Sequence, residues 1–188
     1  MYIELFVLTI VAFLIAVVVR TFIAQPFVVS GDSMLPSFKQ NDYLVIDEVT
    51  YDFEKPKRGD IAVFRYPLDP SVYFIKRIVG IPGDAVVIHN GVVSLRVQGA
   101  TTTNTLAEPY ILPAMQKVDT STTTLGEDEY FALGDNRNES FDSRVWGPVP
   151  ERYIVGRALV RVFPITSFGT LPGEYHFQNV GTSTAKSK

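Results

Sequence analysis

The feature that most constrains this chain is an uninterrupted apolar segment at its N-terminus. Leu5–Val19 contains no charged residue, and with its flanking residues it reaches about 20 residues, the length that a helix needs to cross a bilayer core. Glu4 and Arg20 lie near its two ends, where a long side chain such as that of Arg20 can reach the lipid headgroups. We therefore expect residues 1–24 to form a single transmembrane anchor.

Two other interpretations of this segment stay open. A cleaved export signal begins with basic residues and ends in a small-x-small site, whereas this chain begins with Met-Tyr-Ile-Glu and continues after Arg20 with Thr-Phe-Ile-Ala-Gln-Pro. A helix buried in a soluble core usually has an amphipathic pattern, which the unbroken apolar run lacks. A retained anchor fits the residues better than either alternative. The charges around the segment are too sparse to fix its orientation by the excess of Lys and Arg on the cytoplasmic side.

Composition excludes several classes of protein. The chain has 188 residues, enough for one domain of moderate size and a short appendage. It has no cysteine and only two histidines, His89 and His176, so disulfides, cysteine nucleophiles and zinc hydrolases are not expected. The net charge is −3 without a basic patch, and nucleic acid is therefore not an expected partner.

The remainder of the chain has the pattern of a β protein. Short runs rich in branched and aromatic residues alternate with turn signals, and no long helical period appears after residue 30. Asn90-Gly91 between two such runs indicates a type I′ hairpin. We predict a mainly β, antiparallel, folded sheet or barrel-like catalytic core. The expected strands are 43–46, 61–64, 72–79, 85–88, 92–97, 130–133 and 153–163.

The same patterns divide the chain into three parts. Residues 1–24 are the expected anchor, and residues 25–180 form the β-rich domain. Within it, residues 98–128 are rich in threonine around one apolar patch and are interpreted as a small insertion, an excursion from the core sheet. Residues 181–188 are small and polar, and we expect a disordered tail.

Three segments carry groups suited to catalysis. The first, Ser30–Pro36, places a serine in a Gly-containing turn directly after the apolar segment, although Ser, Gly and Asp also occur in ordinary loops. The second, Val72–Gly80, places Lys76 between Phe74 and Ile78 on one face of a strand. Poor hydration among such neighbours lowers the pKa of a lysine and makes the amine a usable base; a lysine on an edge strand that reaches solvent is the alternative.

The third segment, Gly134–Gly147, is dense in acids, amides, hydroxyls and arginines and ends in Trp146-Gly147. Such a density of hydrogen-bonding groups in an otherwise apolar β protein is typical of a scaffold in which each buried polar group has a partner. A solvated loop is the alternative, but it would not require Asp142 and Arg144 two positions apart beside a tryptophan.

Taken together, these segments resemble the bacterial type I signal peptidases, in the compact form found in Gram-positive organisms. These enzymes are membrane-anchored Ser/Lys endopeptidases. The similarity runs from the apolar segment to about Phe163, and its motifs occur in the order of the family. They are Gly31-Asp-Ser-Met-Leu-Pro36, Arg58-Gly-Asp-Ile-Ala-Val-Phe64, Phe74-Ile-Lys-Arg-Ile-Val-Gly-Ile-Pro-Gly-Asp84 and the block from Gly134 to Gly147.

The resemblance implies a role for each matching residue. Ser33 is the expected nucleophile and Lys76 the expected general base. Ser140 matches the serine that hydrogen-bonds and orients the lysine amine. Two structural ion pairs are expected beside the site, one between Arg77 and Asp135 and one between Asp142 and Arg144.

The expected oxyanion hole departs from the usual pattern. The backbone N–H of Ser33 supplies one donor. The position two before the nucleophile is a serine in some members but Gly31 here, so either the main chain supplies the second donor or the hole is weaker. Ser30 is one residue further upstream. The sequence also has Asn138-Glu139-Ser140 where the family usually has Asp-Asn-Ser.

The resemblance also implies the reaction and its setting. The expected enzyme is a membrane-bound serine endopeptidase that removes signal peptides from exported preproteins after a small-x-small motif, without a metal or organic cofactor. Its partners are secreted preproteins and the lipid bilayer, and its catalytic domain lies on the extracytoplasmic side of the cell membrane. A self-cleaving Ser/Lys protease and a catalytically inactive, membrane-tethered peptide-binding module are the alternatives.

Overall fold

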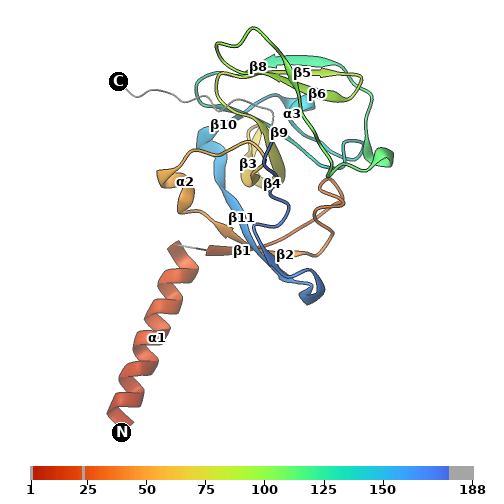
Figure 1. Cartoon of the computed structure of the whole chain (residues 1–188). Helices are drawn as coiled ribbons and strands as arrows, with labels where there is room; N and C mark the ends of the chain where they lie inside the picture. The colour runs from red at the N-terminus through yellow and green to blue at the C-terminus, as the bar shows by residue number, and fades with distance from the viewer. Residues whose placement is uncertain (1, 23, 178–188) are drawn as a thin grey trace.

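The computed structural model describes residues 2–22 and 24–177, and the side chains of residues 14–25 lie outside that description. A helix projects from a β-rich body in which two sheets lie one above the other (Figure 1). The predicted disordered tail at residues 181–188 lies outside the described residues.

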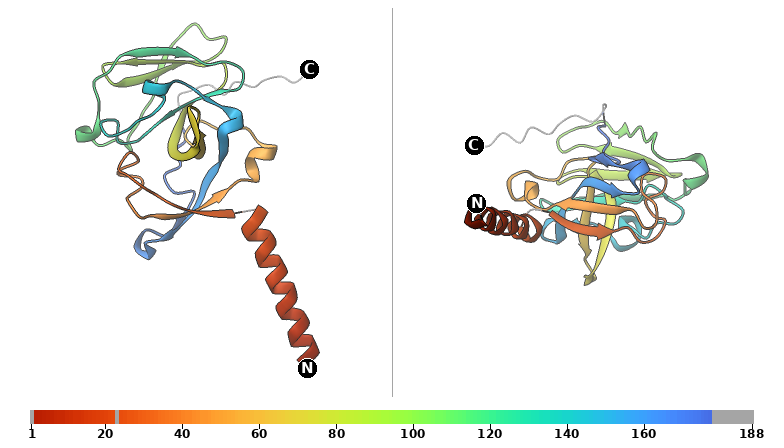
Figure 2. Two further views of the ribbon diagram at one scale, coloured as in Figure 1. Left: turned by 180° about the vertical axis from the view of Figure 1, so that it is seen from behind. Right: turned by 90° about the horizontal axis from the view of Figure 1, so that it is seen from below.

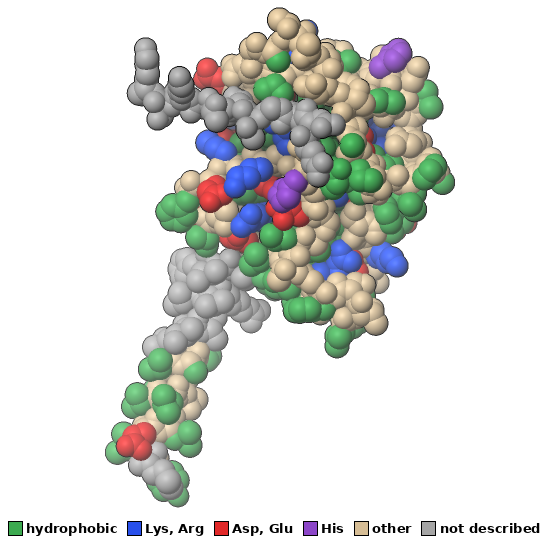
Figure 3. All heavy atoms as spheres, viewed as in Figure 1, with side chains coloured by type: hydrophobic (Ala, Val, Ile, Leu, Met, Phe, Trp, Pro, Cys, Tyr) green, Lys and Arg blue, Asp and Glu red, His purple; other side chains and the backbone are tan. Residues whose placement is uncertain are grey.

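The helix, α1, spans Tyr2–Phe22. It points away from the body in Figure 1 and in the left view of Figure 2, and its described apolar side chains, within residues 2–13, are exposed (Figure 3). Within residues 2–22 and 24–177, no helix has both the length and the apolar content that crossing a bilayer requires. The predicted helix is therefore confirmed, but its predicted role as a transmembrane span is not.

The larger sheet runs in the order β1-β2-β11-β3-β4-β9-β10, with β12 beside β11. Neighbouring strands are antiparallel throughout, as the branched and aromatic runs predict, and in the described residues the order has two ends and does not close into a barrel. The strands are β1 (Ala24–Val28), β2 (Tyr43–Asp47), β3 (Ile61–Tyr66), β4 (Asp69–Gly80), β9 (Glu129–Leu133), β10 (Val149–Pro150), β11 (Ile154–Phe163) and β12 (Gly169–Thr170).

The smaller sheet has the order β7-β6-β5-β8. Its centre is the hairpin predicted from Asn90-Gly91, formed by β5 (Ala85–His89) and β6 (Val92–Arg96). Residues 98–128 add one strand to each side, β7 (Asn104–Thr105) and β8 (Ser121–Thr124). This threonine-rich segment is therefore part of a second sheet and not only a loop.

The described helices after residue 30 are short, as the sequence predicts. They are α2 (Thr50–Phe53), α3 (Ser143–Trp146) and the 3-10 turns Pro113–Met115, Glu151–Tyr153 and Ile165–Ser167. The apolar core consists of three clusters. One of them joins the two sheets, because Val79 of β4 and Phe131 and Leu133 of β9 pack with the aliphatic residues of β5 and β6.

The position of β4 matters most for the site. It pairs with β3 over most of its length, but its described pairing with β9 begins only at Arg77. The other edge of residues 69–76 is therefore open, and the side chain of Lys76 lies at the end of that open edge.

Candidate active site

Buried apolar side chains hold the turn that carries Ser33 in place. Met34 and Phe38 are 1% and 0% exposed and pack in the cluster that includes Leu44 and Ile46. The Phe38 N–H donates to the Met34 carbonyl at 2.8 Å. Burial of these two side chains fixes the turn and leaves Ser33 facing the cleft.

Gly31 allows the chain to enter this turn. Its φ is +86°, a conformation that residues with a side chain adopt at a cost, although space for a Cβ atom is open. Its N–H donates to Gln40 Oε1 at 2.5 Å. This bond engages the N–H of Gly31 in the described conformation, and the second oxyanion donor stays a prediction without an assigned group.

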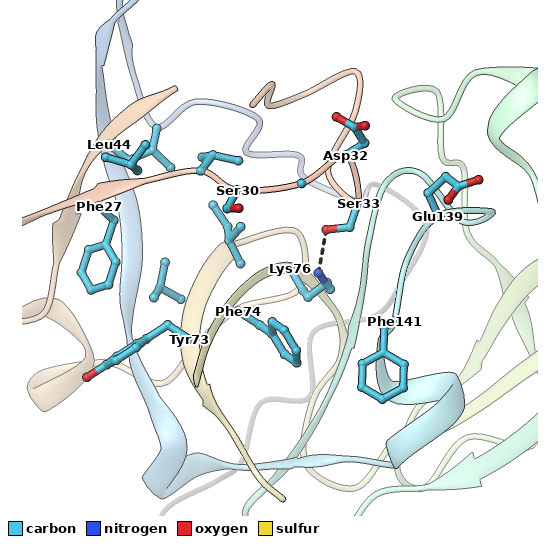
Figure 4. A pocket seen from close by; sticks show the side chains of 15 residues that line it. Phe27, Ser30, Asp32, Ser33, Leu44, Tyr73, Phe74, Lys76, Glu139 and Phe141 are labelled. Carbon is cyan, nitrogen blue, oxygen red and sulfur yellow. Dashed lines mark hydrogen bonds between the residues drawn. The ribbon is translucent and has the colours of Figure 1, made fainter. Parts of the chain in front are cut away.

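Lys76 meets Ser33 across the cleft. The Nζ atom of Lys76 lies 2.7 Å from Ser33 Oγ (Figure 4) and 5.2 Å from the centroid of the Phe74 ring. The Lys76 side chain comes from β4, whereas Ser33 comes from the turn after β1, so the contact joins two distant parts of the sequence. Lys76 is 3% exposed, and the alternative of a solvent-exposed lysine is therefore wrong.

Burial changes the acid–base behaviour of this amine. Loss of hydration lowers the pKa of Lys76 to about 8, although the charges of Asp142 and Asp135 act in the opposite direction. With that pKa, about a tenth of the amine is uncharged at pH 7, and more than half is uncharged above pH 8. The uncharged amine can accept a proton from the hydroxyl of Ser33.

Arg77 and Asp135 form a fully buried ion pair beside the site. Arg77 Nε and Nη2 donate to the two carboxylate oxygens of Asp135 at 2.8 and 2.7 Å, and both side chains are 0% exposed. Arg77 Nη1 donates to the carbonyl oxygens of Gly59 and Gly173. The Tyr110 ring lies against the guanidinium, with Arg77 Cζ 3.8 Å from the ring centroid. Asp135 also accepts from Ser37 Oγ. Charge and hydrogen bonds are thus satisfied, as burial of a guanidinium requires.

Asp142 and Arg144 form the second expected pair. Asp142 Oδ1 accepts from Arg144 Nε at 2.8 Å, and Oδ2 accepts from the Gly134 N–H at 3.1 Å. Burial alone would raise the pKa of the Asp142 carboxyl, but the hydrogen bonds and charge of Arg144 outweigh it and hold that pKa below its usual value. Asp142 therefore stays a carboxylate that fixes Gly134.

Ser140 does not occupy the predicted position. Its Oγ atom is buried without a hydrogen-bond partner in the described part of the chain, and the predicted bond to Lys76 is not formed. Ser140 Oγ lies close to Gly134, since a Cβ atom added at Gly134 would lie 2.2 Å from it. The hydroxyl of Ser140 lies over the backbone of Gly134 and not against the amine.

A cleft leads to the Ser33–Lys76 pair. It has a volume of about 250 Å³ and is lined by β1, the nucleophile turn, β4, Glu139 and Phe141. Phe27 and Tyr73 face each other at one end, whereas Asp32 and Glu139 lie at the other end, beyond Ser33 (Figure 4). Ser30 is exposed and lines the cleft. No group of three or more His, Asp or Glu side chains in the described residues is arranged to hold a metal ion.

Asn136 is a contact residue that the motifs did not single out. Its backbone N–H donates to the Ser33 carbonyl at 3.0 Å, and its Nδ2 donates to the Asp32 carbonyl at 3.2 Å. The residue lies within the polar block from Gly134 to Gly147, but only the fold brings that block to the nucleophile turn.

A serine hydroxyl within hydrogen-bonding distance of a buried lysine amine is the constellation of the serine hydrolases that use lysine as the base. The comparisons with known proteins lead to the same class. The family described as "Signal peptidase, peptidase S26" matches residues 2–163, and the chain belongs to this family. It is a serine endopeptidase that removes signal peptides, which confirms the resemblance found in the sequence.

Individual relatives agree with this assignment. The chain is 39% identical over 178 residues to the probable signal peptidase I-1 of Synechocystis sp., covering 90% of this chain and 86% of the relative. It is 37% identical over 165 residues to the signal peptidase I of Leptolyngbya laminosa, covering 84% and 77%. A crystal structure of a signal peptidase I from Enterococcus faecalis aligns with 28% identity and a TM-score of 0.46, covering 55% of this chain and 97% of that one.

Proposed function

We propose that Ser33 is the nucleophile of this peptidase and that Lys76 is its general base. The observation that carries the proposal is the 2.7 Å contact between Ser33 Oγ and a lysine amine that is 3% exposed. A hydroxyl is a weak nucleophile until an adjacent base removes its proton. Lys76, with a pKa lowered by burial to about 8, is the base in contact with it.

The proposed reaction has two halves. Ser33 Oγ attacks the scissile carbonyl carbon while its proton moves to Lys76 Nζ, and the resulting ammonium gives that proton to the departing amine. The mature protein leaves with a free amino group, and the signal peptide stays as an ester on Ser33. Lys76 then takes a proton from water, whose oxygen attacks the ester. The ammonium returns the proton to Ser33, and the signal peptide leaves with a carboxyl end.

Attack by Ser33 places negative charge on the oxygen of the scissile carbonyl, and a hydrogen-bond donor is required to stabilise it. We assign the backbone N–H of Ser33 to this role, since none of the described hydrogen bonds uses it. The N–H of Gly31 is bonded to Gln40, and so the second donor expected from the main chain has no assignment. Arg77, Asp135, Asp142 and Arg144 support the site through their ion pairs and do not touch the reacting atoms.

We propose that the substrate binds as an extended strand in the cleft. The edge of β4 is open over residues 69–76, and an added strand takes its affinity from main-chain hydrogen bonds and its specificity from alternate side-chain pockets. The cleft of about 250 Å³ suits small residues at the first and third positions before the cut. This arrangement supports the small-x-small preference of signal peptide cleavage.

The proposed setting is a membrane surface. In this proposal, residues 1–24 hold the protein in the bilayer, and residues 25–180 form a catalytic domain on the extracytoplasmic side of the cell membrane. Two observations support it: Leu5–Val19 has no charge, and the described side chains Leu5, Phe6 and Phe13 are 64%, 66% and 67% exposed, an exposure that water disfavours and lipid does not. Secreted preproteins would meet the cleft there.

Cleavage of a preprotein tests the two catalytic assignments. The purified full chain is incubated with a preprotein, the cut is mapped by mass spectrometry, and Ser33→Ala and Lys76→Ala are compared with Ser121→Ala and Lys117→Ala as matched controls. We expect a cut after a small residue, a loss of roughly 10³-fold or more in the first two variants, and unchanged rates in the controls. If the unchanged chain leaves the preprotein intact, an inactive peptide-binding module is favoured. If Lys76→Ala stays active, Lys76 is not the general base.

The pH dependence tests the protonation state. The base acts only when uncharged, so kcat/KM should rise with pH and level off above the pKa of Lys76, with a midpoint near pH 8. The measurement is single-substrate cleavage between about pH 6 and pH 10 at constant ionic strength. A rate that is flat over this range would contradict a lysine base.

A further inference from the structure

The segment Gly134–Asn136 lies directly against the nucleophile turn. A Cβ atom added at Gly134 would lie 2.5 Å from the Ser33 carbonyl oxygen, so only glycine permits this approach. Asn136 contacts the carbonyl on each side of the nucleophile: its backbone N–H bonds to the Ser33 carbonyl, and its side-chain Nδ2 bonds to the Asp32 carbonyl. Asn136 is 6% exposed.

The second of these bonds has a consequence for the N–H of Ser33. The Asp32 carbonyl and the Ser33 N–H belong to one planar, trans peptide group, in which the C=O and N–H bonds point in opposite directions. A side chain that holds the carbonyl on one side therefore directs the N–H to the other. Asn136 Nδ2 holds the Asp32 carbonyl, and none of the described hydrogen bonds takes up the Ser33 N–H.

We propose that Asn136 is a positioning residue that aims the Ser33 N–H at the oxyanion of the tetrahedral intermediate. The inference rests on the proposed function, in which Ser33 is the nucleophile and its N–H the oxyanion donor. A donor that is already aimed where charge develops pays no reorganisation cost during the reaction. The Leu35 N–H also donates to the Asp32 carbonyl at 3.2 Å. Without the Asn136 amide, this one bond holds the peptide group between Asp32 and Ser33 less firmly, and the donor is aligned only part of the time.

The chemistry of the side chain is specific to an amide. Its NH₂ group donates to a carbonyl, and an isosteric carboxylate would place an acceptor oxygen against that carbonyl oxygen. A residue that merely fills space would tolerate Asn136→Asp better than Asn136→Ala. A residue that holds the Asp32 carbonyl gives the opposite order.

The test is a kinetic comparison of Asn136→Ala, Asn136→Ser and Asn136→Asp with Asn138→Ala as control. Asn138 is a neighbouring asparagine whose Nδ2 bonds to the Ala114 carbonyl, away from the nucleophile. We expect kcat to fall roughly 10- to 100-fold in the Asn136 variants, less than the loss of a whole oxyanion donor. KM should stay within about twofold, Asn136→Asp should be the least active, and Asn138→Ala should behave as wild type.

Two readouts separate this role from a general loosening of the site. A peptide aldehyde that forms a tetrahedral adduct with Ser33 should lose affinity in proportion to kcat, because transition-state analogues depend on the same donor. The midpoint of the pH profile should stay near that of the wild type, since Lys76 remains buried. Thermal melting identifies the folded variants. Any one of them tests the effect on kcat and aldehyde affinity, and the order of activities is read from Asn136→Ala and Asn136→Asp when both fold.

Three results would overturn the inference: unchanged kcat and aldehyde affinity, a shift of the pH midpoint that accounts for the loss, or Asn136→Asp more active than Asn136→Ala. Each would do so while Ser33→Ala remains inactive, so the proposed function would survive. Activity in Ser33→Ala would instead remove the proposed function itself.

Discussion

The two sheets of this protein differ in the charged side chains that they bury beside their apolar clusters. The smaller sheet buries aliphatic side chains, including Val86, Ile88, Val93 and Leu95. The larger sheet and the segment after β9 bury charge. The buried charged residues there include Lys76, Arg77, Asp135, Arg137 and Asp142.

The difference lies in which buried charges are paired. Arg77 pairs with Asp135, Arg137 with Glu108, and Asp142 with Arg144. Lys76 is a member of no ion pair among the described residues and faces a hydroxyl instead. Burial of a charge is costly unless a partner compensates it. Lys76 has no such partner in the described part of the chain, and loss of hydration lowers its pKa to about 8. The ion pairs belong to the scaffold, whereas Lys76 is the base that we propose.

Removal of a paired charge should have the largest effect. Asp135→Ala leaves the guanidinium of Arg77 buried without its carboxylate, and we expect a loss of about 3–5 kcal/mol in the free energy of unfolding together with strongly reduced activity. Urea denaturation and preprotein cleavage measure the two effects. The isosteric Asp135→Asn retains an acceptor for Arg77 and should lose less. A loss under about 1 kcal/mol in Asp135→Ala would mean that water replaces the carboxylate.

A substitution that creates a cavity in the smaller sheet should lower the stability of the protein without lowering its activity. Leu95 is 0% exposed, so Leu95→Ala should lower the free energy of unfolding by about 2–4 kcal/mol. Because Leu95 lies on β6 of the smaller sheet, whereas Lys76 lies on the larger one, kcat/KM measured well below the melting temperature should match that of the wild type. A fall in kcat/KM in the fully folded variant would show that the two sheets are coupled in catalysis.

Substitutions on the outer surface of the smaller sheet should have the smallest effect on stability and activity. Thr122 lies on β8 with its side chain exposed, and Thr122→Ala should change the free energy of unfolding by no more than about 0.5 kcal/mol. Thermal melting together with cleavage of the same preprotein checks this expectation. A larger loss would indicate that β8 contributes more to the sheet than its exposed position suggests.

Local sequence patterns were sufficient for much of the fold. The seven β-rich runs form strands, and the Asn90-Gly91 turn joins β5 to β6. The patterns missed β1, which contains Pro26 and follows the apolar segment, and β8, a threonine run. Both are strands because β2 and β5 offer them edges, and such pairing depends on tertiary context more than on propensity.

The site was predictable where residue type alone carries the chemistry. A serine and a lysine in matching motifs were sufficient to predict that Ser33 and Lys76 lie together, while their catalytic roles stay a prediction. The hydrogen bonds around them were not, because they depend on backbone approach across long separations. The bond from Asn136 to Asp32 joins residues 104 positions apart, and Ser140 Oγ has no hydrogen-bond partner among the described residues, although motif matching predicted a bond to Lys76.

The direct succession of α1, β1 and the nucleophile turn has a mechanical consequence. Val28 ends the strand that follows the helix, and Ser33 lies in the very next turn. Few residues therefore separate Ser33 from α1. If α1 is held in a membrane, as we propose, this short connection would fix the distance from the bilayer at which a bond is cut, and an insertion between α1 and Ser33 would change that distance.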